Sequence, residues 1–308
     1  MSESSSTTIA VVSDTHYWVR NQPVVNADGS IQLQKWSEEL LDVLLAELVE
    51  ADVDLVLHLG DLTCGGGSFQ MPPDDFAQTM SYMHRRFSEL PMPVVALPGN
   101  HDVRPGVGDL QDFYRLWQYE AGLGKTIDLP QARLILLNSM GHSSEQIAAA
   151  PEGDPVYGWV SDAEIARLDT ALATAAGTPV LIFTHQLLER WSGEQPWQDY
   201  FGILNAPDVL DVIARRGGVS AVLQGHAHRL DIQEHRIDSD RVAVFGVVPA
   251  IIEFPVAWVR LNLTADQGHC QLQRLPLAEI AAISERSGSG QTWRQGKPAW
   301  WDYRFALC

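Results

Sequence analysis

The sequence predicts an α/β fold, because short apolar runs rich in β-branched residues alternate along the chain with segments of helical periodicity. Hydrophobic residues make up 45% of the 308 residues and charged residues 19%, which indicates a folded protein with a substantial core. Composition changes only near the C-terminus, so we expect residues 1–283 to form one domain.

Eight apolar runs have the length and composition of strands. They are Thr8–Ser13, Asp54–Leu59, Pro93–Leu97, Arg133–Asn138, Pro179–Thr184, Val219–Gln224, Arg241–Val247 and Val256–Leu263, and strand structure is expected to continue to about Leu275.

Five segments have the periodicity of amphipathic helices. In the first, Leu40, Leu41, Leu44, Leu45, Leu48 and Val49 share one face. The others are Phe76–Glu89, Leu110–Tyr119, Ser161–Ala175 and Pro207–Arg216. Ser161 and Glu164 have the spacing of a capping box at the start of their helix.

Residues 284–308 differ from the rest of the chain. Ser284–Gly290 (SERSGSG) has the composition of a flexible linker, and an aromatic tail with Trp293, Trp300, Trp301, Tyr303 and Phe305 follows it. Exposed aromatic patches are uncommon on soluble monomers. We therefore expect the tail to pack back on the domain, to act as a lid, or to form a contact between copies in a homo-oligomer.

The charge limits the classes of partner. Lys and Arg total 21 against 39 Asp and Glu, which gives a formal net charge of −18 and disfavours binding to nucleic acid through its phosphates. The widely spaced cysteines at positions 64, 270 and 308 do not form a disulfide framework and suit a reducing compartment. Because the sequence shows neither a signal peptide nor an apolar stretch long enough to span a membrane, we expect a cytoplasmic protein without a membrane partner.

Polar side chains follow five of the predicted strands. They are Asp14 and His16 in SDTH, Asp61 in GD, Asn100, His101 and Asp102 in GNHD, His185, and His226 and His228 in GHAH. Ligands of open α/β sheets bind at the carboxyl ends of the strands, so we expect these side chains to meet at one edge. In the paired motifs the middle residue should point away if the chain stays extended, and Gly60, Gly99 and Gly225 should permit sharp turns.

This donor set is rich in imidazole and carboxylate, contains no thiolate, and is too large for one first-row ion. It suits two divalent ions bridged by a carboxylate, and Mn, Fe, Zn and Co would all be accepted. Two metals bridged by hydroxide supply a nucleophile at neutral pH and hold the attacking and leaving oxygens of a phosphoryl displacement. Such a pair would also create a positive pocket in an acidic protein.

The motifs D-x-H, G-D, G-N-H-D, a lone H and G-H-x-H, each in order at a strand end, resemble the calcineurin-like metallophosphoesterase superfamily over about residues 9–263. The resemblance implies a four-layer α/β/β/α sandwich of two mixed sheets, with a dinuclear metal site at the C-terminal ends of strands. It implies that one metal is held by Asp14, His16 and His228, the other by Asn100, His185 and His226, and that Asp61 bridges them. It also implies that His101 contacts the substrate phosphate and protonates the leaving oxygen, while Asp102 orients His101 or its neighbours.

Details of the motifs distinguish between branches of the superfamily. The sequence after Asp61 lacks the arginine of the protein Ser/Thr phosphatases, and Cys64 stands where purple acid phosphatases have tyrosine. The GNHD-x-R motif, Asn138-Ser139, and Gly158, Val160, Ser161 and Glu164 resemble the cyclic-nucleotide and glycerophosphodiester phosphodiesterases. One departure is His185-Gln186-Leu187, where that branch usually has HHP.

The resemblance therefore implies a phosphodiesterase that hydrolyses small phosphodiesters with a metal-bridging hydroxide. The alternatives are a phosphomonoesterase or nucleotide pyrophosphatase of the same superfamily, a nuclease, which the charge disfavours, and a binding scaffold, which the complete ligand set disfavours.

Other side chains have weaker claims to a role. His58, inside a strand, is expected to be a hydrogen-bonded structural histidine, whereas His142 could approach the site. Arg104 could contact phosphate or hold its loop through an ion pair. Trp18, Trp191 and Trp197 could stack on a base, cap the pocket, or simply pack.

Overall fold

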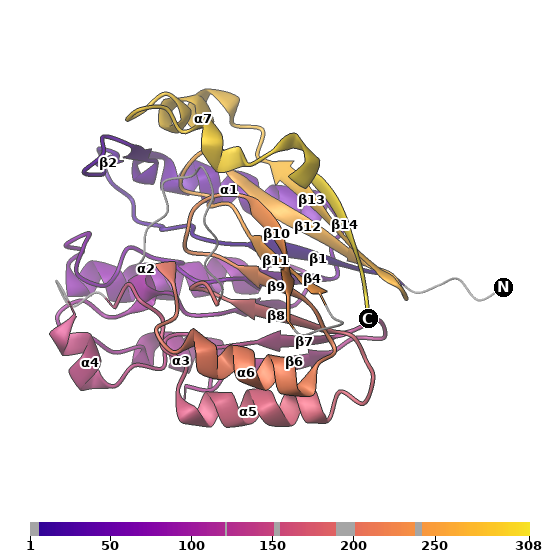
Figure 1. Cartoon of the computed structure of the whole chain (residues 1–308). Coiled ribbons are helices and arrows are strands. Elements are labelled where there is room, and N and C mark those ends of the chain that lie inside the picture. Colours follow the sequence, from indigo (N-terminus) through magenta and orange to yellow (C-terminus); the bar gives the residue numbers. More distant parts are fainter. Residues whose placement is uncertain (1–5, 121, 151–154, 189–200, 238–241) are drawn as a thin grey trace.

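The computed structural model describes residues 6–120, 122–150, 155–188, 201–237 and 242–308, so Trp191 and Trp197 lie outside the described residues (Figure 1). The strands of the large sheets are β1 (Thr7–Val12), β4 (Leu55–His58), β5 (Val94–Ala96), β6 (Lys125–Asp128), β7 (Arg133–Leu136), β8 (Val180–Thr184), β9 (Val219–Gln224), β10 (Asp231–Arg236), β11 (Val242–Val247), β12 (Ala257–Leu263), β13 (Gln267–Arg274) and β14 (Asp302–Ala306). A small hairpin consists of β2 (Val24–Val25) and β3 (Ile31–Gln32). The α-helices are α1 (Ser37–Glu50), α2 (Pro73–Ser88), α3 (Gln111–Trp117), α4 (Ser144–Ala149), α5 (Asp162–Ala173), α6 (Ala206–Arg216) and α7 (Ala278–Glu285). The 3₁₀ turns are η1 (Gln34–Trp36), η2 (Asn100–Asp102), η5 (Thr292–Gln295) and η6 (Pro298–Trp300).

Both large sheets are mixed. The first has the order β14-β13-β12-β1-β4-β5, in which β1, β4 and β5 are parallel and the other pairs are antiparallel. The second has the order β10-β11-β9-β8-β7-β6, in which β11, β9, β8 and β7 are parallel and the two edge strands are antiparallel. Parallel neighbours bring their carboxyl ends to the same edge of each sheet.

The two sheets pack face to face around a shared apolar core. In β1, Ile9 and Val11 face this core with Leu134 and Phe183 of the second sheet. Ala10 and Val12, on the other side of the pleat, face the helices. The strand is buried on both faces, which explains its continuous apolar run.

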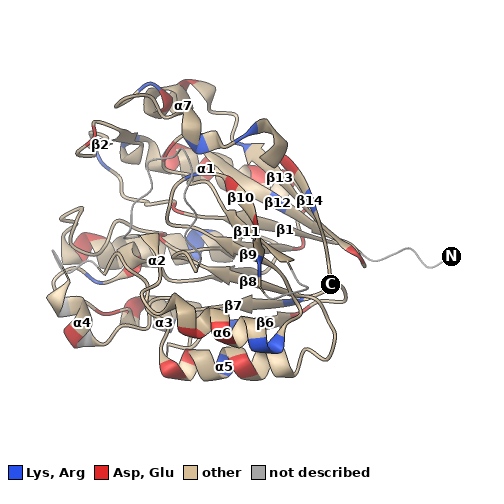
Figure 2. Ribbon diagram, viewed as in Figure 1, with Lys and Arg blue, Asp and Glu red and all other residues tan. Residues whose placement is uncertain are grey.

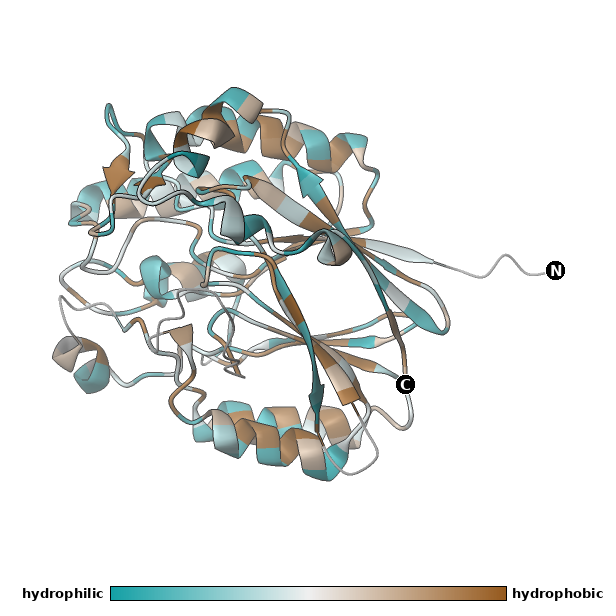
Figure 3. Cartoon of the chain, turned by 45° about the horizontal axis from the view of Figure 1, so that its top comes forward, coloured by the Kyte–Doolittle hydropathy of each residue, from teal (hydrophilic) through white to brown (hydrophobic). Residues whose placement is uncertain are grey.

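Helices cover the outer faces of both sheets. Leu40, Leu44 and Leu48 of α1 pack with residues of α2 and α3 against the first sheet, and each fully buried leucine contributes about 1.5–3 kcal/mol. The second sheet is covered by α5 and α6, whose buried residues include Leu168 and Val209. The helices at the bottom of the view in Figure 3 alternate between hydrophobic and hydrophilic residues, as amphipathic helices do. The prediction of a four-layer α/β/β/α sandwich is confirmed.

The expected capping box at the start of α5 is only half right. The Ser161 hydroxyl accepts the backbone N–H of Glu164 at 3.2 Å. The Glu164 carboxylate accepts the backbone N–H groups of Gly124 and Asn138 instead, and pairs with Arg167. Glu164 is buried, so its negative charge needs polar partners, and these three residues supply them. In a capping box the same charge would lie near the surface.

The segment expected to be a flexible linker, Ser284–Gly290, begins inside a helix. Helix α7 continues to Glu285, and the buried Ser284 hydroxyl accepts the backbone N–H of Phe254. After it, β14 pairs with β13 at the edge of the first sheet, shown in yellow in Figure 1. Phe305 of β14 is buried in the core between the sheets, so the tail packs back on the domain. The predicted contact between copies stays a prediction.

The outer surface of the described chain is acidic. Asp and Glu residues occur on α1, α2, α4, α5 and α6 (Figure 2). None of the helices in the described residues combines the length and the apolar character needed to cross a bilayer.

Candidate metal centre

The candidate ligands lie where the carboxyl ends of the two sheets meet. Asp14 and His16 follow β1, Asp61 follows β4 and Asn100 follows β5, all in the first sheet. His185 follows β8, and His226 and His228 follow β9, in the second sheet. The structure thus brings all seven predicted metal ligands to one place, while their role as ligands stays a prediction.

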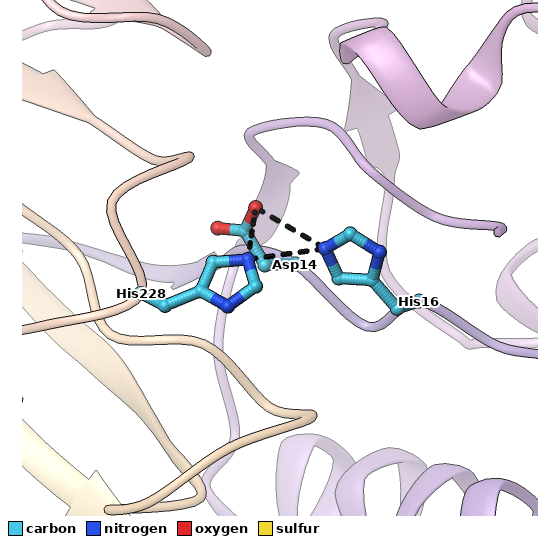
Figure 4. A group of neighbouring side chains, drawn as sticks. All are labelled: Asp14, His16 and His228. Carbon is cyan, nitrogen blue, oxygen red and sulfur yellow. Dashed lines mark hydrogen bonds and ion pairs between the residues drawn. The ribbon is translucent and has the colours of Figure 1, made fainter. Parts of the chain in front are cut away.

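One group of donors consists of Asp14, His16 and His228 (Figure 4). The Nε2 atoms of the two imidazoles face each other at 3.1 Å. Asp14 Oδ1 lies 3.3 Å from the Nε2 of His228 and 3.8 Å from that of His16. All three side chains point to a common centre, which is the arrangement that a bound cation requires.

The second group consists of Asp61, His185 and His226, with Asn100 beside them. Asp61 Oδ2 lies 3.2 Å from His185 Nε2, and Asn100 Oδ1 lies 3.3 Å from the same nitrogen. Asp61 Oδ2 is also 3.4 Å from His16 Nε2 of the first group. The Asp61 carboxylate therefore stands between the two groups, in the position of a bridging ligand.

Hydrogen bonds leave one oxygen of each carboxylate for a cation. Asp14 Oδ2 accepts the Ser13 hydroxyl and the backbone N–H of His226, and Asp61 Oδ1 accepts the backbone N–H of His101 at 2.7 Å. Asp14 Oδ1, Asp61 Oδ2 and His226 Nε2 are buried without a hydrogen-bond partner among the described residues. Buried polar atoms are costly when unpaired, so these three atoms fit divalent cations.

Two imidazoles are held in the tautomer that a metal needs. His185 Nδ1 donates to the Leu59 carbonyl at 2.8 Å, and His228 Nδ1 donates to Glu253 Oε2 at 2.6 Å. With the proton on Nδ1, the lone pair of Nε2 points into the donor group.

Burial and neighbouring charges set the protonation of these groups. Burial would raise the pKa of Asp14 and of Asp61, but the adjacent imidazoles of His228 and His185 outweigh it and lower both. Burial lowers the pKa of His226 to about 3, so that ring stays neutral. Burial opposes a charge on His228 as well, yet the carboxylates of Asp14 and Glu253 raise its pKa to about 10.

The backbone of the paired motifs differs from the expectation. Asp14, His16, Asp61, His226 and His228 all have positive φ, from 39° to 64°, so these segments are not extended. Such conformations are strained for residues other than glycine and collect at functional sites. Thr15 does point away, since its hydroxyl bonds to the Leu62 carbonyl, but the residues on either side of it have positive φ.

Gly99 was expected to permit a sharp turn, but the structure gives it a different role. It allows the end of β5 to approach Asp61 closely. Its φ of −110° is open to any residue. A Cβ at this position would lie 2.2 Å from Asp61 Oδ1 and 2.5 Å from Asp61 N. The absence of a side chain lets the strand end lie directly against the candidate bridging carboxylate.

His101 lies beside the two donor groups, and Asp102 is buried next to the backbone that carries them. The His101 Nδ1 is 3.0 Å from the Gly65 carbonyl, and the ring is grouped with His16 and Asp61. The Asp102 carboxylate accepts the backbone N–H groups of Leu62, Thr63 and Gly99 and does not bond to the imidazole of His101. Burial and the charge of Asp61 raise the pKa of Asp102 to about 7. These hydrogen bonds of Asp102 fit the second of the two expected roles, orientation of the neighbours of His101, which stays a prediction.

Members of both donor groups, namely His16, Asp61, Asn100, His226 and His228, line a cavity of about 1070 Å³. The cavity lining includes residues of the β2–β3 hairpin, such as Asn26, and of the C-terminal tail, such as Trp293 and Arg294. His142 also lines it, and burial lowers its pKa to about 4. The exposed apolar side chains of Val25, Tyr157 and Leu204 belong to the same lining.

Four other residues discussed from the sequence, Arg104, Trp18, His58 and Gln186, do not line this cavity. Arg104 is 4.0 Å from Asp112 in an ion pair and does not line the cavity. Trp18 lines a separate hollow beside α2. His58 is buried and bonds to the Thr15 hydroxyl and the backbone N–H of Gly60, as predicted for a structural histidine. Gln186 is buried, bonds to the Ser139 hydroxyl and does not line the cavity.

Sequence reasoning missed Glu253 and Arg294, which complete the wall next to His228. Arg294 Nη1 lies 3.2 Å from Glu253 Oε2, and both residues line the cavity. A signal for Glu253 was present, because it is the single charged residue in the apolar run AIIEFPVA, and buried carboxylates need partners.

Comparisons with known proteins agree with this geometry. The profile of the calcineurin-like phosphoesterase family matches residues 7–230. None of the curated protein sequences matches the chain. A solved dimetal phosphatase from Danio rerio is similar, with a TM-score of 0.70 and 16% identity over 98% of this chain and 99% of that one. A purple acid phosphatase from yellow lupin (Lupinus luteus) seeds has a TM-score of 0.56 and 13% identity over 90% of this chain and 52% of that one, and PhoD has 0.58 and 13% over 89% and 66%.

Proposed function

This chain belongs to the calcineurin-like phosphoesterase family, and we propose that within it the protein is a phosphodiesterase for small diesters of the cyclic-nucleotide or glycerophosphodiester type. The observation that carries the proposal is the pair of donor groups that share Asp61, with members of both lining one cavity. Two divalent ions would fit these groups, one held by Asp14, His16 and His228, the other by Asn100, His185 and His226. Bound there, the ions would supply Lewis-acid polarisation of phosphoryl oxygens and an activated water.

The charge of the cavity favours a diester over a monoester. Among the described lining residues, Arg294 is the single Lys or Arg side chain, and its guanidinium is paired with Glu253. A dianionic monoester is usually held by further Arg or Lys donors, whereas a monoanionic diester needs fewer cations. The cavity also supplies apolar surface for a second ester substituent, since Val25 is 63%, Tyr157 40% and Leu204 54% exposed.

His101 is the candidate general acid. Its Nδ1–H donates to the Gly65 carbonyl, which orients the ring, so in the imidazolium form the second proton, on Nε2, could pass to the leaving oxygen. Its backbone N–H also holds Asp61 Oδ1, so the acid and the bridging carboxylate keep a fixed separation. The Asp102 carboxylate supports this arrangement because it accepts the backbone N–H groups of Leu62, next to Asp61, and of Gly99, close to His101.

The first experiment measures metals and substrates together. We expect elemental analysis to find two divalent ions per chain, and bis-p-nitrophenyl phosphate to be hydrolysed with a higher kcat/KM than p-nitrophenyl phosphate. A preference for the monoester would support the phosphomonoesterase alternative. A preference for a nucleotide pyrophosphate over small diesters would support the nucleotide pyrophosphatase alternative, and a preference for single-stranded DNA would support the nuclease.

The matched variants test the bridging carboxylate. Asp61→Ala should lose both activity and metal, because Asp61 faces both donor groups. Asp208→Ala, an exposed aspartate on α6, serves as the control and should keep both. An active Asp61→Ala enzyme with its full metal content would refute the proposed site.

We also propose a cytoplasmic location and a small phosphate ester as the partner. The absence of a disulfide among Cys64, Cys270 and Cys308, all of them free thiols, supports a reducing compartment.

A further inference from the structure

Glu253 is a buried carboxylate with three partners at the edge of the metal groups. It is 1% exposed and lies between β11 and β12. Its Oε2 accepts His228 Nδ1–H at 2.6 Å and lies 3.2 Å from Arg294 Nη1, while its Oε1 accepts Asn26 Nδ2–H at 3.3 Å. The carboxylate is therefore fixed in one orientation, and through it the ring of His228.

Arg294 comes from the C-terminal tail and contacts both ends of His228. Its Nη1 donates to the backbone carbonyl of His228 at 3.0 Å and pairs with Glu253, which holds the imidazole. The residue is 8% exposed, and its Nε donates to Gln291 Oε1 at 2.9 Å. The Arg294 carbonyl accepts the backbone N–H of Leu230 at 2.8 Å, which ties the tail to the loop after His228.

The contact between Arg294 and Glu253 also compensates a buried negative charge. A buried carboxylate is costly unless a cation compensates it, and removal of one partner of such a pair leaves an uncompensated buried charge. Among the contacts that Glu253 makes with the described residues, the Arg294 guanidinium is the one permanent cation. Without it, Asn26 and His228 alone would hold the carboxylate.

We propose that Arg294 is a positioning residue for the metal site, which acts through Glu253 to set the orientation of His228. The tail beyond residue 284 then controls the affinity of the ion held by Asp14, His16 and His228. The contacts of Glu253 and Arg294 with the described residues reach His228 and do not reach Asn100, His185 or His226, which would hold the other ion. The inference rests on the proposed two-ion site. Orientation of metal-bound histidines by a carboxylate typically changes metal affinity by about 10–100-fold.

The test compares Mn²⁺ binding to the purified full-length chain and its variants by calorimetric titration. We expect Arg294→Met to weaken one of two ions by about 10–100-fold and to leave the other unchanged. Arg294→Lys, which keeps the charge but not the fork of donors, should recover part of the loss. Arg304→Met, an exposed arginine of the same tail, should bind both ions as the parent does.

Two results separate failure of this inference from failure of the proposed function. If the parent chain binds fewer than two ions, the proposed function fails. If the parent binds two and Arg294→Met binds both with unchanged affinity, or weakens both equally, the positioning role is wrong. Should Arg294→Met not fold in a thermal melt, the isosteric Glu253→Gln must show the same selective loss of one ion. Unchanged binding in that variant would also overturn the inference.

Discussion

Substitution of Gly99 by alanine tests how closely the candidate bridging carboxylate must be placed. The new Cβ would lie 2.2 Å from Asp61 Oδ1, whereas an ordinary contact begins at 3.4 Å, so the carboxylate must retreat by the difference, about 1.2 Å. The φ of Gly99 is −110°, which alanine adopts freely, but the new Cβ would also lie 2.5 Å from the backbone N of Asp61, so the backbone must move together with the carboxylate. A misplacement of about 1 Å in a catalytic arrangement can cost about 10²-fold in rate. We therefore expect kcat/KM for bis-p-nitrophenyl phosphate to fall by about two orders of magnitude.

The assay needs three readings on the same preparation: kcat/KM, metal content and thermal melting. Gly106→Ala is the control, because a Cβ there meets nothing within 4 Å although its φ is +74°. It should lose about 1–2 kcal/mol of stability from the strained backbone and keep full activity. A Gly99→Ala enzyme with parental kcat/KM and metal content would refute the argument from close approach.

Three further predictions concern the general acid, the tail and the metals. His101→Gln should keep its metals and lose about 10²–10⁴-fold in kcat on an alkyl diester, with a smaller loss on bis-p-nitrophenyl phosphate, whose leaving group needs little protonation. Parental rates on both esters would exclude the role. Phe305→Ala should lower the free energy of unfolding in urea by about 3 kcal/mol, because the ring is 7% exposed in the core between the sheets, and should leave kcat/KM unchanged. Dialysis against a chelator should lower the melting temperature, and Mn²⁺ at 100 times its Kd should restore about 2.7 kcal/mol; equal stability with and without metal would contradict the site.

The sequence was sufficient for the interior of the large sheets and insufficient for three of their four edges. The eight apolar runs all correspond to strands, of which seven lie inside the sheets and β5 forms an edge. The strands of the large sheets that were missed, β6, β10 and β14, are the other three edges. In β10 and β14, charged and exposed residues interrupt the apolar pattern. Edge strands need such residues to avoid pairing with other chains, so the property that protects an edge also removes its signal from the sequence.

The candidate site shows the same division between local and long-range information. Each motif contains its donors within a few residues, so the sequence predicts them and their place at a strand end. The pairing of Glu253 with Arg294 joins two segments that no motif connects. The positive φ of His16 and His228 likewise depends on the surrounding structure, because an isolated chain of these residues would avoid it.

The two sheets each contribute part of both donor groups, which has a consequence for how the protein acquires its metals. His16 and His228 are 212 positions apart in the chain, yet their Nε2 atoms are 3.1 Å apart. Neither sheet alone carries all of Asp14, His16 and His228, or all of Asp61, His185 and His226, so the two groups are complete only after the sheets have docked. We expect metal uptake to be a late event in folding, which a segment of the chain emerging from the ribosome cannot begin. Once bound, the ions would cross-link the two sheets and oppose their separation, so metal release and the opening of the sandwich should occur together.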